Sequence, residues 1–394
     1  MNNKETSAAF TLLLGLLIGL SSLGSDLFVP ALPDTAAWFS APVSAAQMTL
    51  TTYFLGLALG QLFWGPLSDR HGRRPVLLVA LAIMLAAALA APFARSIGVL
   101  SAVRLVQGLA MSAGIVVARS IVRDLHGHER AARLLARAMI VFSMVPLVAP
   151  VCGAFLTSYA GWRAIFWGYA LVAGGLLVAV AAGLRETAPA ERRAANPAEI
   201  ARTLGAILAQ RAFTGPLGVA LCCFAALLAW VTNSSFTLVH GAGISVGAYG
   251  WMFAGVMLGQ IAGAWIASRF VMRLGNARLL HGGVRLVLYG GGAAAALAWI
   301  GETHWLALVV PFAVVLFGAA LVLPSATALA LTPFPQTAGA ASSLVGALTY
   351  IVGALLSALL GALFDGTARP MASAAALAGL GAVALERRLA RGKA

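Results

Sequence analysis

The stretch YFLGLALGQLFWGPLSDR, Tyr53 to Arg70, recurs in the second part of the chain as MFAGVMLGQIAGAWIASR, Met252 to Arg269. Each copy is an apolar run that ends in a basic segment. Identical residues recur at one constant offset, among them Gly56, Leu59, Gly60, Gln61 and Arg70, which recur as Gly255, Leu258, Gly259, Gln260 and Arg269. We interpret the chain as two halves with the same topology.

The composition around this repeat is that of a membrane protein. Of 394 residues, 61% are apolar and only 10% are charged, and the mean hydropathy is +0.93. A soluble domain carries about 25% charged residues. No run alternates as the strands of a membrane barrel do. The composition therefore predicts an all-α membrane protein.

A transmembrane helix needs about 20 mainly apolar residues, and the chain offers twelve such runs, six in each half. Parallel repeats of this kind are typical of transporters that bind their cargo between the halves. We predict spans at 9–32, 46–67, 75–94, 97–118, 136–158, 162–184, 213–239, 247–267, 279–299, 304–331, 337–364 and 370–385.

The net charge of +14 is concentrated in alternate connections between these runs. This asymmetry follows the positive-inside rule. It predicts that both termini are cytoplasmic, and it assigns the basic residues to the membrane surface rather than to nucleic acid. The three cysteines, Cys152, Cys222 and Cys223, lie in apolar runs without metal-ligand spacing, so we expect no metal site.

A polar stretch divides the chain, and we predict an N-terminal half at 1–184, a cytoplasmic linker at 185–212 and a C-terminal half at 213–394. Asn196, Pro197 and Glu199 form a helix-start signal in the linker. An apolar face follows, so we expect an amphipathic helix at the membrane surface. The face consists of Ile200, Leu204, Ile207 and Leu208.

The segment GPLSDRHGRRPV, Gly65 to Val76, resembles the signature loop G-x-x-x-D-R-x-G-R-R of the major facilitator superfamily. It lies between the second and third predicted spans, where that family carries it. The matching residues are Gly65, Asp69, Arg70, Gly72, Arg73 and Arg74. The resemblance implies a conformational switch in which Asp69 faces the start of span eleven, near Thr337, and Arg73 pairs with Asp124.

Three further segments narrow the resemblance. Arg104, Gln107 and Gly108 match the R-x-x-Q-G motif of span four. SMVPLVAPVCGAF in span five resembles the G-P-x-x-G-G motif of proton-driven exporters through Pro150 and Gly153, with Pro146 as an extra helix-bending residue. SDLFVPALP, which begins at Ser25, resembles the D-x-x-x-P-x-x-P segment of twelve-span drug:proton antiporters of the bicyclomycin-resistance and chloramphenicol-exporter type.

Asp26 is the one acidic residue clearly inside a predicted span. A carboxylate there costs roughly 2.5–3.5 kcal/mol on insertion scales, which marks it as functional. Arg104 is predicted at the same depth of span four, since both lie about 10 Å from the outer helix ends. We therefore predict an Asp26–Arg104 pair that carries the coupling proton. A static ion pair that only joins two helices is the alternative.

The resemblance implies a proton-coupled exporter of small hydrophobic drugs that works by alternating access in the bacterial inner membrane. No phosphate-binding loop is present, so we do not expect ATP to be the energy source. We expect a monomer that uses the proton gradient and needs no cofactor. No nucleophile–base cluster suggests an enzyme. A phenicol-selective exporter, a sugar or metabolite exporter and a transporter-like sensor are the alternatives. Candidate drug-cavity residues are Tyr53, Gln107, Met111, Trp230, Asn233, Phe236 and Met252.

Overall fold

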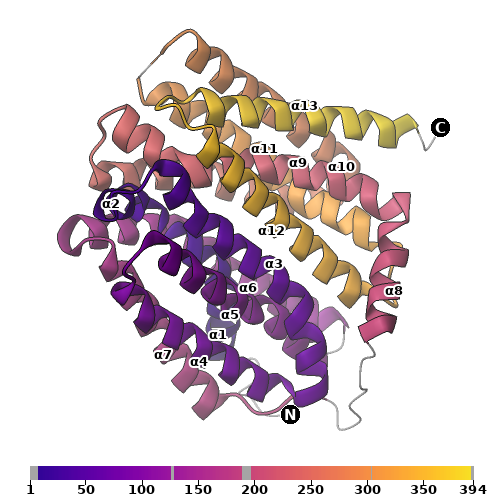
Figure 1. Cartoon of the computed structure of the whole chain (residues 1–394). Coiled ribbons are helices and arrows are strands. Elements are labelled where there is room, and N and C mark those ends of the chain that lie inside the picture. The colour runs from indigo at the N-terminus through magenta and orange to yellow at the C-terminus, as the bar shows by residue number, and fades with distance from the viewer. Residues whose placement is uncertain (1–7, 126–127, 189–196, 303, 392–394) are drawn as a thin grey trace.

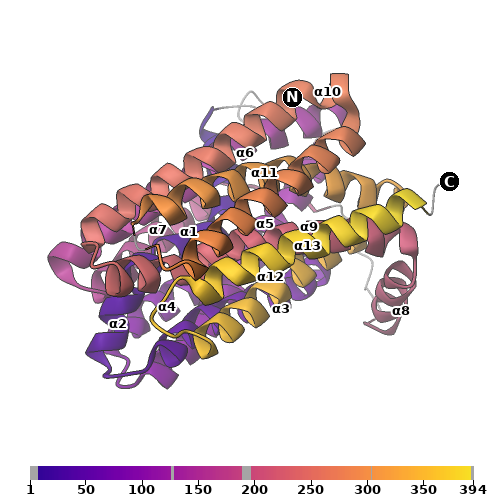
Figure 2. The same cartoon turned by 90° about the horizontal axis from the view of Figure 1, so that it is seen from above.

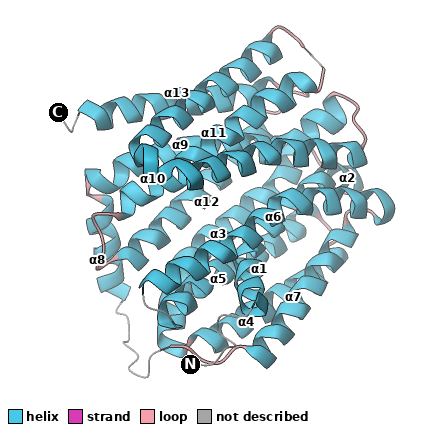
Figure 3. Ribbon diagram, turned by 180° about the vertical axis from the view of Figure 1, so that it is seen from behind, coloured by secondary structure: helices cyan, strands magenta, loops and turns pink. Residues whose placement is uncertain are grey.

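The computed structural model describes residues 8–125, 128–188, 197–302 and 304–391, and within these ranges the chain forms helices without strands (Figures 1 and 3). The helical elements are α1 (Ala8–Asp26), η1 (Val29–Ala31), α2 (Leu32–Trp38), α3 (Val43–His71), α4 (Arg73–Ala90), η2 (Ala91–Phe93), α5 (Ile97–Leu125), α6 (His128–Ala160), α7 (Arg163–Gly183), α8 (Pro197–Leu208), α9 (Arg211–Ser235), η3 (Phe236–Gly241), α10 (Val246–Trp299), α11 (Leu306–Leu331), α12 (Ala338–Ala362) and α13 (Arg369–Arg391).

The predicted twelve-helix membrane fold is confirmed. Within the described ranges, nine helices are long and apolar enough to cross a membrane. One of them, α10, has 54 residues, which is about 80 Å of helix and more than twice the thickness of a bilayer core. Gly275, with a φ of 76°, divides α10 into two limbs that form spans eight and nine. With α3 and α13, the number of spans is twelve.

The first span differs from the predicted continuous helix over 9–32. Helix α1 ends at Asp26, and a short 3-10 turn and α2 complete the crossing. Pro30 and Pro33 lack the backbone N–H that a continuing α-helix would need. Asp26 therefore lies at a break in the helix rather than in its interior.

The internal repeat is visible in the packing of the two halves. A side chain at Gly60 would collide with Leu109 and Ser112 of α5, and one at Gly259 would collide with Ala313 of α11. Repeat-equivalent glycines thus allow span two to approach span four in one half, and span eight to approach span ten in the other. Small residues at such contacts are typical of membrane helix pairs.

The halves meet along two helix pairs, α3 with α12 and α6 with α10 (Figures 1 and 2). We call the side where α3 turns into α4 and where α8 lies the basic face, and the other side the opposite face. Near the opposite face, the buried Gln47 Nε2 donates hydrogen bonds to the Thr232 carbonyl (2.8 Å) and to Asn233 Oδ1 (3.3 Å). Ser357 Oγ donates to Gln47 Oε1 at 3.2 Å. This Gln47 network joins α3, α9 and α12 across the boundary between the halves.

The predicted linker helix is present as α8. Ile207 is only 3% exposed and packs with Phe213 and Leu344, so α8 docks on the C-terminal half through this residue. Leu208, predicted on the same face, is exposed. The proposed cap Asn196 lies outside the described residues.

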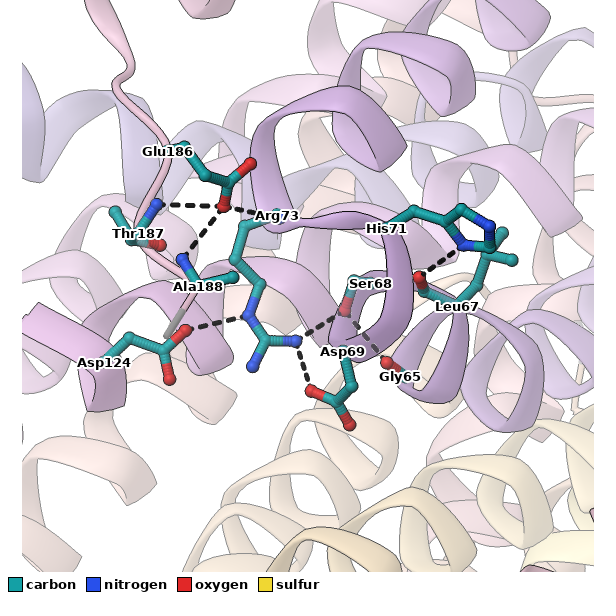
Figure 4. A network of polar contacts seen from close by, with 10 residues as sticks. All are labelled: Gly65, Leu67, Ser68, Asp69, His71, Arg73, Asp124, Glu186, Thr187 and Ala188. Atoms are coloured by element: carbon teal, nitrogen blue, oxygen red, sulfur yellow. Dashed lines mark hydrogen bonds and ion pairs between the residues drawn. The ribbon is translucent and has the colours of Figure 1, made fainter. Parts of the chain in front are cut away.

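The start of α4 is fixed by a carboxylate from another part of the chain (Figure 4). Glu186 Oε1 accepts the backbone N–H of Arg73 at 2.8 Å, and Oε2 accepts that of Arg74 at 3.3 Å. These N–H groups have no acceptor within the helix. Partial burial raises the pKa of Glu186, but the N–H donors of Ala188, Arg73, Thr187 and Arg74 outweigh it and hold that pKa below its ordinary value.

The repeat offers a matched pair of glycine substitutions. We expect Gly56→Ala to lower the stability of the purified protein by about 1–3 kcal/mol, because the new methyl group would overlap the Leu105 carbonyl. Its repeat equivalent, Gly255→Ala, meets open space and should be neutral or stabilising by up to about 1 kcal/mol. Thermal unfolding in detergent measures both, and equal midpoints for the two variants would contradict this account.

Glu186→Gln should destabilise the protein in a pH-dependent way. Because the folded-state pKa is lowered, the contribution of Glu186 is present above the ordinary value of 4.5 and is lost as the pH falls through the folded-state value. We expect a loss of about 0.5–1 kcal/mol at pH 7, which disappears in strong acid. Thermal unfolding over a pH series tests this, with Glu199→Gln on the exposed surface of α8 as the control. A pH-independent difference would assign the effect to packing.

Candidate functional site

Asp26 is the last residue of α1 and is buried, with 6% of its surface exposed. The hydroxyl of Ser25 donates to its Oδ1 at 2.8 Å. The chain leaves the α-helix directly after Asp26, and α6 packs closely on the next residue, since a side chain at Gly153 would overlap the Leu27 carbonyl. The break in α1 is therefore held from the side by α6.

Arg104, on α5, is fully buried. Its Nη1 donates to Gln107 Oε1 at 3.0 Å, and its Nη2 donates to the Gly24 carbonyl at 2.5 Å. The guanidinium lies over the rings of Tyr53 and Phe28, at 4.2 and 4.8 Å from their centroids. Cation–π contacts of this kind partly replace the hydration that a buried cation loses.

The predicted Asp26–Arg104 ion pair is not formed. Within the described part of the chain, Arg104 bonds to the Gly24 carbonyl and Gln107 instead of a carboxylate, and Asp26 bonds to Ser25. Arg104 does lie near the predicted depth, because it contacts Gly24, which is only two residues from Asp26 in α1. Gly24 and Asp26 both belong to α1, and residues two apart on a helix point to nearly opposite sides, so the side of α1 that contacts Arg104 is not the side that carries the Asp26 side chain.

The span-five motif lies within one uninterrupted helix. α6 runs from His128 to Ala160 through both Pro146 and Pro150 without a break. The motif also provides surfaces on which α1 and α10 pack. Gly153 admits the backbone of α1, and the Pro150 carbonyl lies close to Gly250 of α10. The predicted role of the prolines in helix bending stays a prediction, and the structure adds a role of the motif in close packing between α1, α6 and α10.

The seven predicted cavity residues do not line one space. Tyr53 donates to the Ser21 carbonyl at 2.7 Å and contacts Met111, so these two belong to the buried Arg104 cluster together with Gln107. The other four lie in the C-terminal half: Trp230 packs on Phe253 and Phe312, Asn233 bonds to Gln47, Phe236 packs on Phe364, and Met252 is half-buried.

The signature loop forms the network drawn in Figure 4. The expected Arg73–Asp124 pair is formed, with Nε donating to Oδ2 at 2.8 Å, and Nη1 donates to Asp69 and to Ser68 Oγ. We expected this pair to break when the basic face opens, yet it is present beside the cavity described below. Arg73 is 4% exposed, whereas half of the Asp69 side chain is accessible. No hydrogen bond joins Asp69 to the described residues of α12, so the expected contact near Thr337 is absent in this conformation.

A cavity of about 460 Å³ separates Asp69 from the first turn of α12 on the basic face. Its walls come from α3, α5, α8, α11 and α12, so it lies between the two halves. The Gln47 network is on the opposite face. The molecule is thus hollowed between its halves at the basic face and joined by hydrogen bonds near the other.

Three residues with notable partners were missed from the sequence. Gln47 and Glu186 were predicted at or beyond helix ends and carry no motif, so only the tertiary structure shows their partners. Glu386, expected beside a loop, is buried in α13, and its Oε1 accepts from His281 Nδ1 at 2.6 Å. Glu386 directly follows the last predicted span, and an acid at that place was a signal in the sequence that we did not use.

Comparisons with known proteins agree with this geometry. The chain matches the Major Facilitator Superfamily over residues 14–355. It is 32% identical over 376 residues to a bicyclomycin resistance protein homolog of Haemophilus influenzae, covering 94% of this chain and 93% of the relative. It is 30% identical over 358 residues to multidrug resistance protein D of Escherichia coli, covering 90% and 89%.

Among solved structures, a D-xylose-proton symporter superposes with a TM-score of 0.73 over 95% of this chain and 97% of that one, at 15% identity. That likeness concerns the fold. The family match spans most of the chain, and the curated relatives match it nearly end to end. The chain therefore belongs to the Major Facilitator Superfamily of transporters, in its bicyclomycin-resistance branch.

Proposed function

We propose that this protein is a proton-driven exporter of small hydrophobic drugs in the bacterial inner membrane. In this proposal the basic face and both chain ends are cytoplasmic, and a monomer carries out transport using the proton gradient without a cofactor. The similarity to bicyclomycin and multidrug resistance proteins supports the drug class. Proton coupling is proposed because Asp26 is a buried acid at the point where a membrane-spanning helix breaks.

The positions of Asp26 and Arg104 suggest how proton release can be coupled to a movement of the helices. In this conformation Asp26 has no cation beside it, which suits a neutral, proton-loaded carboxyl, because an unpaired buried ion is costly. Loss of the proton creates a carboxylate near Gly24. The guanidinium can then leave the Gly24 carbonyl for Asp26, and this exchange moves α1 relative to α5. Proton release is thereby coupled to a helix movement.

The two faces of the molecule fit an alternating-access cycle. The conformation described here is joined by the Gln47 network at the opposite face and hollowed at the basic face. If the basic face is cytoplasmic, this is the state that captures drug from the cell. Closing the cavity would bring Asp69 to the first turn of α12, where the helix dipole favours an anion.

The direct test of the function is a drug-susceptibility panel in an efflux-deficient bacterium that expresses this chain. Resistance to several unrelated hydrophobic drugs supports the proposal. Resistance to phenicols alone would narrow it to a phenicol exporter, and no change for any drug would overturn it. Everted membrane vesicles add the second measurement, since drug addition should discharge the proton gradient only when the transporter is present.

Asp26→Asn should reduce resistance to the level of cells without the protein, because the amide keeps the shape and cannot carry a proton. Asp26→Glu should retain part of the activity. Asp365→Asn, in a connection outside the spans, is the matched control and should remain fully active. If Asp26→Asn still confers full resistance and still discharges the proton gradient on drug addition, the coupling proton is carried elsewhere.

Asp69→Asn should favour the open basic face and slow transport, with drug binding nearly unchanged. A helix-end contact of this type contributes about 0.3–1 kcal/mol, enough to shift a balanced equilibrium up to about fivefold. The measurement is the labelling rate of a cysteine introduced at Ser343 in the cavity wall, with and without Asp69→Asn. Identical labelling together with normal transport would show that Asp69 does not regulate this opening.

A further inference from the structure

The cavity on the basic face contains charge that the transport scheme does not use. Arg119 and Arg123 of α5 line it, and so do Ser342 and Ser343 of α12. Arg119 is surrounded by protein, yet its surface is open to the cavity. Its Nη1 donates one long hydrogen bond, of 3.3 Å, to Ser342 Oγ.

Neither arginine has a carboxylate partner within the described part of the chain. No hydrogen bond or ion pair engages the Arg123 side chain there, and its Nη1 lies beside Gly339, 3.5 Å from where a side chain on that glycine would begin. The acid that lines the cavity is Asp69, which already accepts from Arg73. Two guanidinium groups therefore share one cavity without a counter-charge of their own.

The first turn of α12 adds to this positive charge. α12 begins at Ala338, and Thr337 does not cap it with its side chain. The N–H groups of this turn therefore lack a side-chain acceptor, and they carry the positive end of the helix dipole. Gly339 and Ala340 of the same turn line the cavity. The positive charge of Arg123 lies beside that positive helix end, and the two repel each other. A bound anion would remove this repulsion.

The rest of the cavity is apolar. Leu62 and Val116 contribute from α3 and α5, and Ile200 and Leu204 from the linker helix α8. A volume of about 460 Å³ is within the range of drug-sized sites. A cationic, hydroxyl-bearing wall thus faces an apolar one.

We propose that this cavity binds an amphipathic organic anion: a carboxylate group held by Arg119, Arg123 and the first turn of α12, attached to an apolar body that lies against α8. The anion takes the place that Asp69 occupies when the cavity closes, so its binding stabilises the open conformation. This inference concerns binding to the chain itself and stands independently of drug export.

The test is binding of three probes with one apolar body and different charge to the purified full-length protein in nanodiscs. The probes are 2-naphthoate, 2-naphthylmethanol and 2-naphthylmethylammonium, measured by calorimetry. We expect the carboxylate to bind tightest and the ammonium weakest. Arg119→Gln and Arg123→Gln should each weaken naphthoate binding roughly tenfold or more, as expected for charge-assisted hydrogen bonds, and should leave the alcohol unchanged.

Arg202→Gln on α8 is the control, because it removes the same charge near the cavity without lining it. It should leave naphthoate binding unaltered. Thermal unfolding of each variant checks that it is folded. Equal affinity for the carboxylate and the alcohol, or equal effects of Arg202→Gln and Arg119→Gln, would overturn the proposal.

A second measurement shows whether the anion is transported cargo or a ligand that stays bound in the cavity. Counterflow of labelled 2-naphthoate in proteoliposomes identifies the anion as cargo that enters through the cavity. Binding without counterflow, together with faster labelling of a cysteine at Ser343, identifies a stationary ligand that holds the cavity open. Either result supports the site, whereas absence of binding refutes it whether or not the protein exports drugs.

Discussion

A guanidinium group buried inside a membrane protein must find all its partners among protein atoms, and Arg104 organises the N-terminal half through that need. Its bonds and ring contacts connect four helices: Gly24 belongs to α1, Tyr53 to α3, Arg104 itself to α5 and Tyr169 to α7. Tyr169 also donates to the Gly24 carbonyl, at 2.9 Å. A carbonyl that accepts from both groups fixes the end of α1, directly before the break at Asp26.

The C-terminal half has the same topology and a different centre. Trp230 of α9 packs between Phe253 of α10 and Phe312 of α11, with ring centroids 6.1 and 5.2 Å apart. This aromatic cluster needs no counter-charge and places no titratable group there. The internal repeat thus supplies two similar frameworks, one centred on the buried Arg104 and the other on the aromatic ring of Trp230. The boundary between the halves is where Gln47 and the basic-face cavity lie.

The sequence predicted the fold well, because apolar length and basic loops act locally along the chain. The repeat predicted two halves of one topology, and the repeat-equivalent Gly60 and Gly259 do pack on equivalent spans, whereas Gly56 packs on α5 and its equivalent Gly255 meets open space. It could not predict that α1 breaks at Asp26, since a proline-containing apolar run can bend or break according to what packs on it. The Asp26–Arg104 pair was predicted from depth alone, and depth does not say which side of α1 faces Arg104. Gln47 and Glu186 were missed because their partners lie far away in the sequence.

The carboxylate at the start of α4 has a consequence for how the protein is made. Glu186 follows α7, so the ribosome produces α4 long before the group that satisfies its first N–H donors. Once Glu186 has been made, every group that fixes the Arg73 network is present, because Asp69 and Asp124 belong to the N-terminal half and Glu186 lies at the start of the linker. Domains generally fold as units during synthesis. The polar linker gives the nascent chain an interval in which the first half completes its structure before α9 enters the membrane.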